Sequence, residues 1–205
     1  SSAFPGDING GLEDYTAAKL LEDIKGASCC IDIHSSNIFL QEVPQVRLND
    51  DYDEMLLHLA KYMNTDLVWI HPSQTVNEGS LAYALNQMGI PTMVTESGSA
   101  FRIRYEYCRQ IIDGIFSVMA ELGIWKGKTN GKNDVPFINE DKICYLNCEF
   151  SGLFVSYKRL KDRVKKGEII GIIQNPLMGA TEEEVIAPVD GILMTLREHP
   201  SVAEG

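Results

Sequence analysis

Along residues 1–123, blocks of apolar residues at helical spacing alternate with short, continuous apolar runs. A helical period indicates a helix with one buried face, and a short apolar run bounded by turn residues indicates a buried strand. The pattern predicts helices over Leu12–Lys25, Asp51–Met63, Ser80–Met88 and Ile103–Leu122, and strands over Ser28–Ile33, Asp66–Ile70 and Pro91–Thr95. Residues 35–50 are expected to form an extended loop or an irregular strand. Strands that alternate with helices predict an α/β fold with a mostly parallel sheet flanked by helices.

The pattern changes after residue 123. Residues 124–140 are polar and punctuated by Gly and Pro, which predicts a linker. Short β-type runs follow, with no convincing helix, at Ile143–Leu146, Leu153–Tyr157, Ile169–Ile173, Val185–Ile186 and Ile192–Leu196. We therefore predict an α/β domain over residues 1–123, a linker over 124–140 and a small all-β module over 141–205.

The β module contains a weak internal repeat. Val164–Gly167 and Val202–Gly205 share a V-x-x-G spacing, and the segment A-P-V-D-G at Ala187–Gly191 lies between them. This arrangement resembles the biotinyl/lipoyl-type β-sandwich, in which carrier proteins present a modified lysine on a hairpin. The corresponding stretch, Gln174–Gly179, has no lysine, which argues against a carrier role. Because another strand would follow Gly205 in such a module, we expect the module to be incomplete at its C-terminal end.

Composition and charge narrow the classes of partner. The 205 residues carry 18 basic and 29 acidic side chains, for a net charge of −11, which argues against nucleic acid because phosphate binding needs an excess of Lys and Arg. No apolar run approaches the roughly 20 residues that span a bilayer, so no membrane partner is expected. The five cysteines are an odd number, and Cys29 and Cys30 are adjacent in a predicted strand, where neighbouring side chains face opposite ways. We interpret all five as reduced thiols of a cytoplasmic protein.

Two predicted strands end in groups that can perform chemistry. Ile31-Asp32-Ile33-His34 and Met93-Val-Thr-Glu96 place a histidine and a carboxylate where ligands bind to open α/β sheets. A neutral imidazole is a good zinc ligand, and a carboxylate beside an activated water can act as a general base. Asp32 has the same strand parity as His34, so it can orient the imidazole. From these residues alone a structural role for His34 stays open, because a catalytic zinc site needs three protein ligands and His58, His71 and His199 complete no set.

Several segments, taken in order, carry a family resemblance. They are F-P-G-D at Phe4–Asp7, I-D-I-H at Ile31–His34, P-Q-V-R at Pro44–Arg47, G-I-P-T-M-V-T-E-S-G at Gly89–Gly98 and the A-P-V-D-G segment of the β module. In this order the chain resembles the succinylglutamate desuccinylase/aspartoacylase family of zinc carboxypeptidase-like hydrolases. The resemblance spans essentially the whole chain and implies a zinc carboxypeptidase-like α/β fold.

The resemblance also implies roles for individual residues. His34 would be the last of three zinc ligands, and Glu96 would be the general base. Family members carry the other two ligands in an H-x-x-E segment upstream of F-P-G, so we expect the α/β domain to be incomplete at its N-terminal end. Ser2 stands where many relatives have an Arg that grips a substrate carboxylate, so the acidic amino-acid substrates of the best-known members are not implied here. Arg47 is the candidate contact for a substrate anion, with an ion pair at the surface as the alternative.

The sequence therefore predicts a zinc-dependent amidohydrolase, a deacylase of an N-acyl amino acid or a similar small amide. Its expected partner is that small molecule, and a homo-oligomer is compatible with the sequence. Two alternatives stay open. One is a carboxypeptidase-like peptidase or amidase, and the other is a non-catalytic binding module that has lost the metal.

Overall fold

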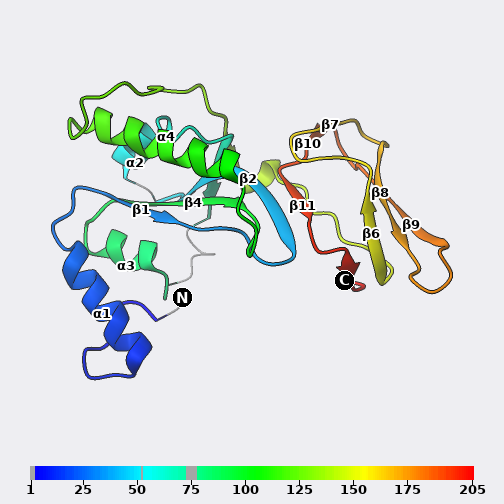
Figure 1. Ribbon diagram of the computed structural model, residues 1–205, viewed down its shortest axis with the longest axis horizontal. Coiled ribbons are helices and arrows are strands. Elements are labelled where there is room, and N and C mark those ends of the chain that lie inside the picture. The colour runs from blue at the N-terminus through cyan, green and yellow to red at the C-terminus, as the bar shows by residue number, and fades with distance from the viewer. Residues whose placement is uncertain (1–2, 52, 73–77) are drawn as a thin grey trace. The chain divides into compact units, whose positions relative to one another are not determined.

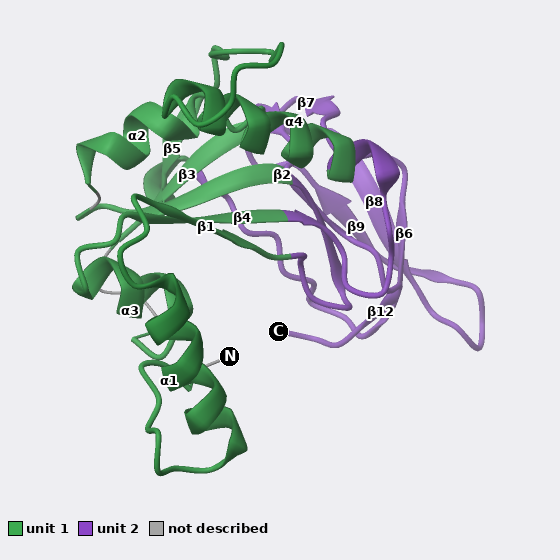
Figure 2. Ribbon diagram, turned by 60° about the vertical axis from the view of Figure 1, so that its left-hand side comes forward, with its two compact units in different colours: residues 1–34, 44–96, 108–142 green, residues 35–43, 97–107, 143–205 purple. Residues whose placement is uncertain are grey.

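The computed structural model describes residues 3–51, 53–72 and 78–205. The chain divides into two compact units (Figure 2), the first made of residues 1–34, 44–96 and 108–142, and the second made of residues 35–43, 97–107 and 143–205. Two short segments that precede residue 123 thus belong to the second unit. The predicted domain boundaries at 123 and 140 stay predictions.

The first unit is built on a parallel-rich sheet. The strand order is β1-β4-β2-β3-β5, with β1 at Cys30–Ile33, β4 at Thr92–Gly98, β2 at Leu40–Asn49, β3 at Leu67–His71 and β5 at Phe137–Asn139. The pairs β1–β4, β2–β3 and β3–β5 are parallel. This confirms the predicted α/β class with a parallel-rich sheet.

The sheet departs from the sequence predictions in two places. Residues 35–50 were expected to hold a loop or an irregular strand, but β2 is a ten-residue strand inside the sheet. The predicted linker also ends in β5, which pairs with β3 as an edge strand, and in a short 3-10 helix, η2, at Glu140–Lys142. The end of the predicted linker joins the sheet because two of its apolar residues, Val135 and Phe137, pack against the core.

Four helices lie close to their predicted positions and end where local signals place them. They are α1 at Leu12–Ile24, α2 at Glu54–Ala60, α3 at Leu81–Gln87 and α4 at Tyr105–Glu121. The side chain of Asp53 accepts a hydrogen bond from the Met55 amide at 2.7 Å, and this N-cap starts α2. Ser80 caps α3 in the same way. Gly123 follows α4 with φ of 74°, a conformation that glycine adopts without strain.

The helices cover both faces of the sheet in the first unit. Figure 1 shows α2 and α4 on one face and α1 and α3 on the other. The larger core cluster joins α2 and α4 to the sheet, with Val46, Leu48, Leu56, Leu59, Met63, Val68, Met93 and Val118 among its buried members. A smaller cluster of Leu21, Ala84, Leu85 and Ile90 joins α1 and α3. No helix in the described ranges has both the length and the apolar character needed to cross a bilayer.

The second unit contains antiparallel sheets. A four-stranded sheet has the order β12-β6-β8-β9, from Ser201–Val202, Gly152–Ser156, Ile169–Gln174 and Thr181–Ile186. A second sheet pairs β10, Gly191–Ile192, with β7, Arg163–Val164. The strand β11, Thr195–Arg197, pairs with Leu40–Glu42, the residues of β2 that belong to the second unit. Residues 143–205 therefore contain strands and turns without a helix, as predicted, but the strand predicted at Ile143–Leu146 is wrong, since this segment has no regular structure and exposes Tyr145 and Leu146.

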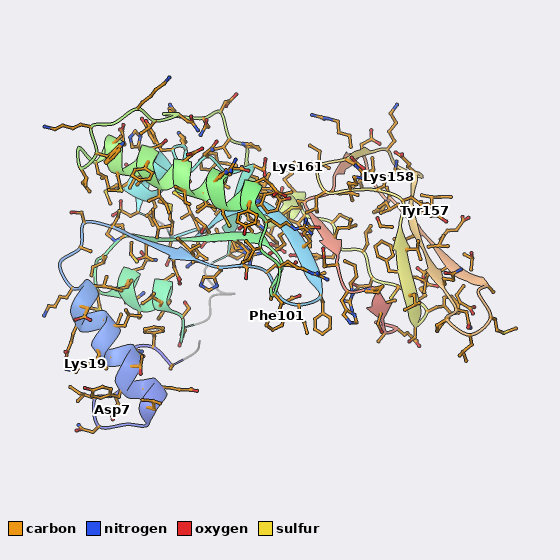
Figure 3. All side chains as sticks on the ribbon, viewed as in Figure 1. Asp7, Lys19, Phe101, Tyr157, Lys158 and Lys161 are labelled. Carbon is orange, nitrogen blue, oxygen red and sulfur yellow. The ribbon has the colours of Figure 1, made fainter. Side chains whose placement is uncertain are left out.

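Two lysines of the second unit have partners within it. Lys158, which follows β6, pairs with Glu168, which precedes β8. The ammonium of Lys161 lies 5.9 Å from the centroid of the Tyr107 ring. Both lysines and the 93% exposed Phe101 are labelled in Figure 3.

Candidate functional site

His34, which directly follows β1, is aligned with Glu96, which lies near the carboxyl end of β4. The parallel register of β1 and β4 aligns Asp32 with Val94 and Ile33 with Thr95. The His34 amide then donates to the Thr95 carbonyl at 2.8 Å, which continues the alignment beyond the end of β1. The predicted neighbourhood of the histidine and the carboxylate is therefore present, and their chemical roles stay predictions.

Asp32 holds the imidazole of His34. Its Oδ2 lies 3.0 Å from Nε2 of His34, a contact that two residues of the same strand parity can make. The pKa of His34 is raised, chiefly because the Asp32 carboxylate accepts a hydrogen bond from the ring, with burial opposing and the charge of Glu96 adding to the effect. Because Nε2 faces Asp32, Nδ1 is the nitrogen that a metal ion would take.

Arg47 approaches Glu96 from the neighbouring strand β2. Its Nη1 lies 3.3 Å from Oε2 of Glu96, and the Glu96 side chain is only 9% exposed. The Arg47 side chain is 28% exposed, so this ion pair is largely removed from water. Arg47 therefore forms an ion pair, but with a buried partner, and its role as a contact for a substrate anion stays a prediction.

Trp69 and Glu140 of this region were missed by sequence reasoning, and His71 was considered only as a zinc ligand. Trp69 on β3 is paired in register with Arg47, and its ring centroid lies 5.4 Å from the Arg47 Cζ. The Trp69 Nε1 donates to Oε2 of Glu140 at 3.2 Å, and the His71 ring stacks on Trp69 at 4.2 Å. The pKa of His71 is lowered, first by burial and then by the charge of Arg47. The alternation of Trp69 and His71 along β3 was the available signal, but it points to a site only once the strand order is known.

The described residues do not make a complete zinc site. Within the described ranges, no group of three or more His, Cys, Asp and Glu side chains is placed to hold a metal ion. His34, oriented by Asp32, has the chemistry of one ligand of such a set. Ser2, the candidate substrate contact, lies outside the described residues.

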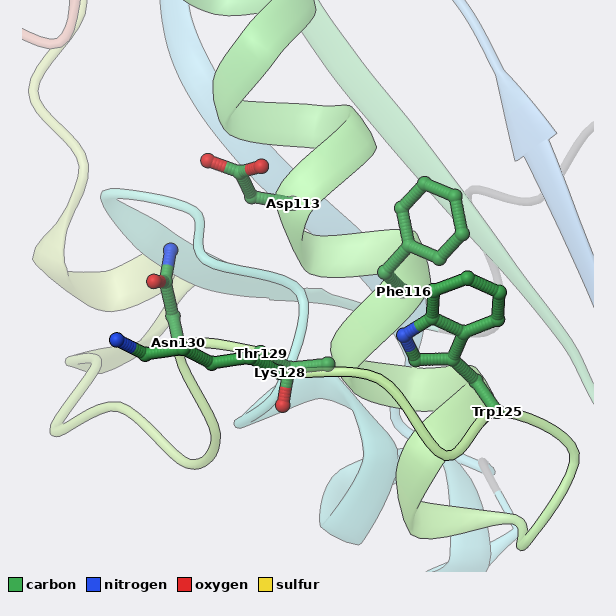
Figure 4. A pocket seen from close by; sticks show the side chains of 6 residues that line it. All are labelled: Asp113, Phe116, Trp125, Lys128, Thr129 and Asn130. Atoms are coloured by element: carbon green, nitrogen blue, oxygen red, sulfur yellow. The ribbon is translucent and has the colours of Figure 1, made fainter.

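A separate hollow lies on the first unit, away from these groups. It has a volume of about 270 Å³ and is lined by Asp113, Phe116, Trp125, Lys128, Thr129 and Asn130 (Figure 4). These residues come from α4 and from the loop after it, and they include none of the predicted site residues. We take the strand-end cluster as the candidate site, because it joins a held imidazole to a buried carboxylate.

Comparisons with known proteins were made by sequence and by structure. No family model and no curated protein matches the chain. A succinylglutamate desuccinylase from Silicibacter sp. TM1040 has a TM-score of 0.85 at 23% identity, over 100% of this chain and 64% of that one. The product-bound ectoine utilization protein EutE (DoeB) from Ruegeria pomeroyi has a TM-score of 0.84 at 21% identity, over 100% and 64%. A succinylglutamate desuccinylase/aspartoacylase from Rhodobacter sphaeroides has a TM-score of 0.77 at 21% identity, over the same shares.

The similarity to these solved structures concerns the fold of the chain. The chain spans less than two thirds of the length of these solved structures, and the sequence identities are low. Every residue of this chain nevertheless falls within the alignment to each of the three. The chain thus has the fold of succinylglutamate desuccinylase/aspartoacylase proteins, in agreement with the resemblance of its motifs.

Proposed function

We propose that the protein is a zinc-dependent amidohydrolase that releases the acyl group of an N-acyl amino acid or a similar small amide. The observation that carries the proposal is the placement of His34, held by Asp32, beside the buried Glu96 near the carboxyl ends of two parallel strands. The shared fold supports it, since proteins named as desuccinylases have the same arrangement of elements.

Glu96 carries the proton transfers in this proposal. Its carboxylate takes a proton from the attacking water while the water oxygen bonds to the carbonyl carbon of the amide. When the C–N bond breaks, Glu96 returns that proton to the leaving nitrogen, and the products are a carboxylic acid and an amine. Zinc, bound by His34 with ligands outside the described residues, would act as a Lewis acid toward the carbonyl oxygen. Asp32 keeps the imidazole in one orientation throughout.

The substrate class follows from charge. Arg47 is the proposed contact for a substrate anion, and because Ser2 stands where many relatives have Arg, the proposed substrate is not limited to acidic amino acids. The net charge of −11 supports a small-molecule partner over a nucleic acid.

The five free cysteines support a reducing compartment such as the cytoplasm. For residues 141–205 we propose a biotinyl/lipoyl-like module, supported by their antiparallel strands.

Two variants of the full-length protein test the assignment. Glu96→Gln keeps the shape of the side chain but cannot accept the proton, so kcat should fall about 10²–10⁴-fold while bound zinc and KM change little. His34→Ala removes a ligand, so zinc content and activity should fall together. Glu22→Gln is the matched control, because Glu22 is an exposed carboxylate on α1 that pairs with Lys19.

The measurement is kcat per bound zinc, on a panel of N-acyl amino acids and short peptides. A Glu96→Gln enzyme with full zinc and near-normal kcat would remove Glu96 from the mechanism. Preference for short peptides would favour the carboxypeptidase-like alternative, which the serine at position 2 keeps open. A full-length protein without zinc and without turnover would favour the non-catalytic binding module.

A further inference from the structure

A chain of side-chain contacts crosses the sheet from the candidate base to the opposite edge. Glu96 on β4 contacts Arg47 on β2 at 3.3 Å, and the Arg47 guanidinium lies over the ring of Trp69 on β3, 5.4 Å from its centroid. Trp69 in turn donates its indole N–H to Glu140 of η2 at 3.2 Å. Three neighbouring strands and the segment after β5 therefore each contribute one link.

Two of the four members of this chain of contacts, Trp69 and Glu96, are buried, so they can fix positions. Trp69 is 6% exposed and Glu96 is 7% exposed. The Nε atom of Arg47 is also buried, although the side chain as a whole is partly open. An arginine has many rotamers, and a cation–π contact with a rigid, buried ring selects among them.

His71 completes the support of the indole. Its ring stacks on Trp69 with an interplanar angle of 28°. Burial and the nearby charge of Arg47 lower the pKa of His71, so the ring is neutral at neutral pH and adds no positive charge beside the guanidinium. Trp69 is thus packed by one neutral ring and hydrogen-bonded at its far end.

We propose that Trp69 is a positioning residue for the reaction: it holds the Arg47 guanidinium against the Glu96 carboxylate and is itself held by Glu140. The proposal rests on the proposed function, because positioning matters only if Glu96 is the base. It assigns to Arg47 the task of presenting Glu96 in one orientation. The contact between Trp69 and Arg47 and its effect on turnover are therefore measured in separate experiments.

The contact is tested without any substrate. In the ¹⁵N-labelled full-length protein, the Arg47 Nε–H signal is identified by its loss in Arg47→Lys, and its exchange with water is measured. Trp69→Leu should accelerate that exchange about tenfold, the size expected for the loss of a desolvated cation–π contact, whereas Trp69→Phe should change it by less than about threefold. Trp125→Leu is the matched control, since Trp125 is the other tryptophan of the chain and packs on Phe116. An unchanged exchange rate in Trp69→Leu would overturn the proposal.

The effect on turnover is tested by a cycle with Arg47→Met. Trp69→Leu should lower kcat about tenfold, and should have no further effect on kcat in the Arg47→Met background, because both changes remove the same support. A merely structural tryptophan would lower kcat by the same factor in both backgrounds, which would refute the positioning role. If Trp69→Leu does not fold, Glu140→Leu takes its place, because it removes the carboxylate that accepts the indole N–H hydrogen bond, and an Arg47 exchange rate unchanged in Glu140→Leu would contradict the proposed link.

The two proposals fail differently. If Glu96→Gln keeps normal turnover while Trp69→Leu still frees Arg47, the general-base assignment fails and the contact chain stands. If Glu96→Gln abolishes turnover while Trp69→Leu leaves both exchange and kcat unchanged, the positioning role fails and the proposed function stands.

Discussion

The ion pair between Arg47 and Glu96 allows a quantitative prediction. At the observed 3.3 Å, the attraction between the two charges is about 5 kcal/mol for an effective dielectric constant of about 20. The cost of taking both groups from water offsets much of this gain. Replacing Arg47 by Met leaves the 7% exposed Glu96 without this partner, and removing one member of a buried pair costs about 3–5 kcal/mol. Because Arg47 is partly exposed, we expect a loss near the lower end, about 3 kcal/mol.

The assay is urea unfolding of the parent protein, Arg47→Met, Glu96→Gln and the double variant. Replacing Glu96 by a neutral amide in the Arg47→Met background removes the buried charge, so the double variant should lose only about 1 kcal/mol relative to the parent. The coupling energy of the cycle should then be at least about 2 kcal/mol. A loss below about 0.5 kcal/mol for Arg47→Met, with additive effects in the double variant, would refute a buried, interacting pair.

Two further predictions concern stability. The pKa of His71 is lowered from 6.5, so the unfolded state binds more protons just below pH 6.5, and the stability contributed by burying a neutral His71 should be lost as the pH falls through that window. His71→Gln should reduce this loss, as measured by urea unfolding at pH 7.5, 6 and 5. Gly114→Ala should destabilise the protein by about 3 kcal/mol or more, because its new Cβ would lie 1.9 Å from the Met63 carbonyl oxygen. Thermal unfolding measures this, and Gly11→Ala is the control, since its Cβ would meet only Asp14, at 3.8 Å.

The helices and the apolar strands of the first unit were accessible from the sequence. Each is a periodic or continuous apolar block bounded by a strong local signal, such as the Ser80 cap or the glycine at position 123. The boundaries shifted by a few residues because the caps, and not the apolar spacing, determine where a helix begins. The run at Ser28–Ile33 was predicted to be a buried strand. Cys30 and Ile31 do pack against different clusters, but Ile33 is 58% exposed on this edge strand.

The part of the site formed by Asp32, His34 and Glu96 could also be predicted from the sequence. Parity along one strand places Asp32 and His34 on one face, and the alternation of strands with helices predicts that strand ends meet at one edge of a sheet. Strand order is not encoded in either pattern. The contact between Arg47 and Glu96, and that between Arg47 and Trp69, depend on β2 lying between β4 and β3.

The error at β2 is informative about function. A strand inside a sheet is expected to be apolar on both faces, and β2 was misjudged because Gln45 and Arg47 interrupt its apolar residues. Val46 and Leu48 face the main core, so the polar residues occupy the opposite face, where Arg47 meets Glu96 and Trp69. Gln45 is fully buried there, and its amide has no hydrogen-bond partner among the residues that the structure describes. Burying such groups costs stability, and proteins accept that cost mainly where a site requires it. Gln45 and Arg47, the polar residues that made β2 look like a loop in the sequence, therefore give independent support for placing the site on their face of the sheet.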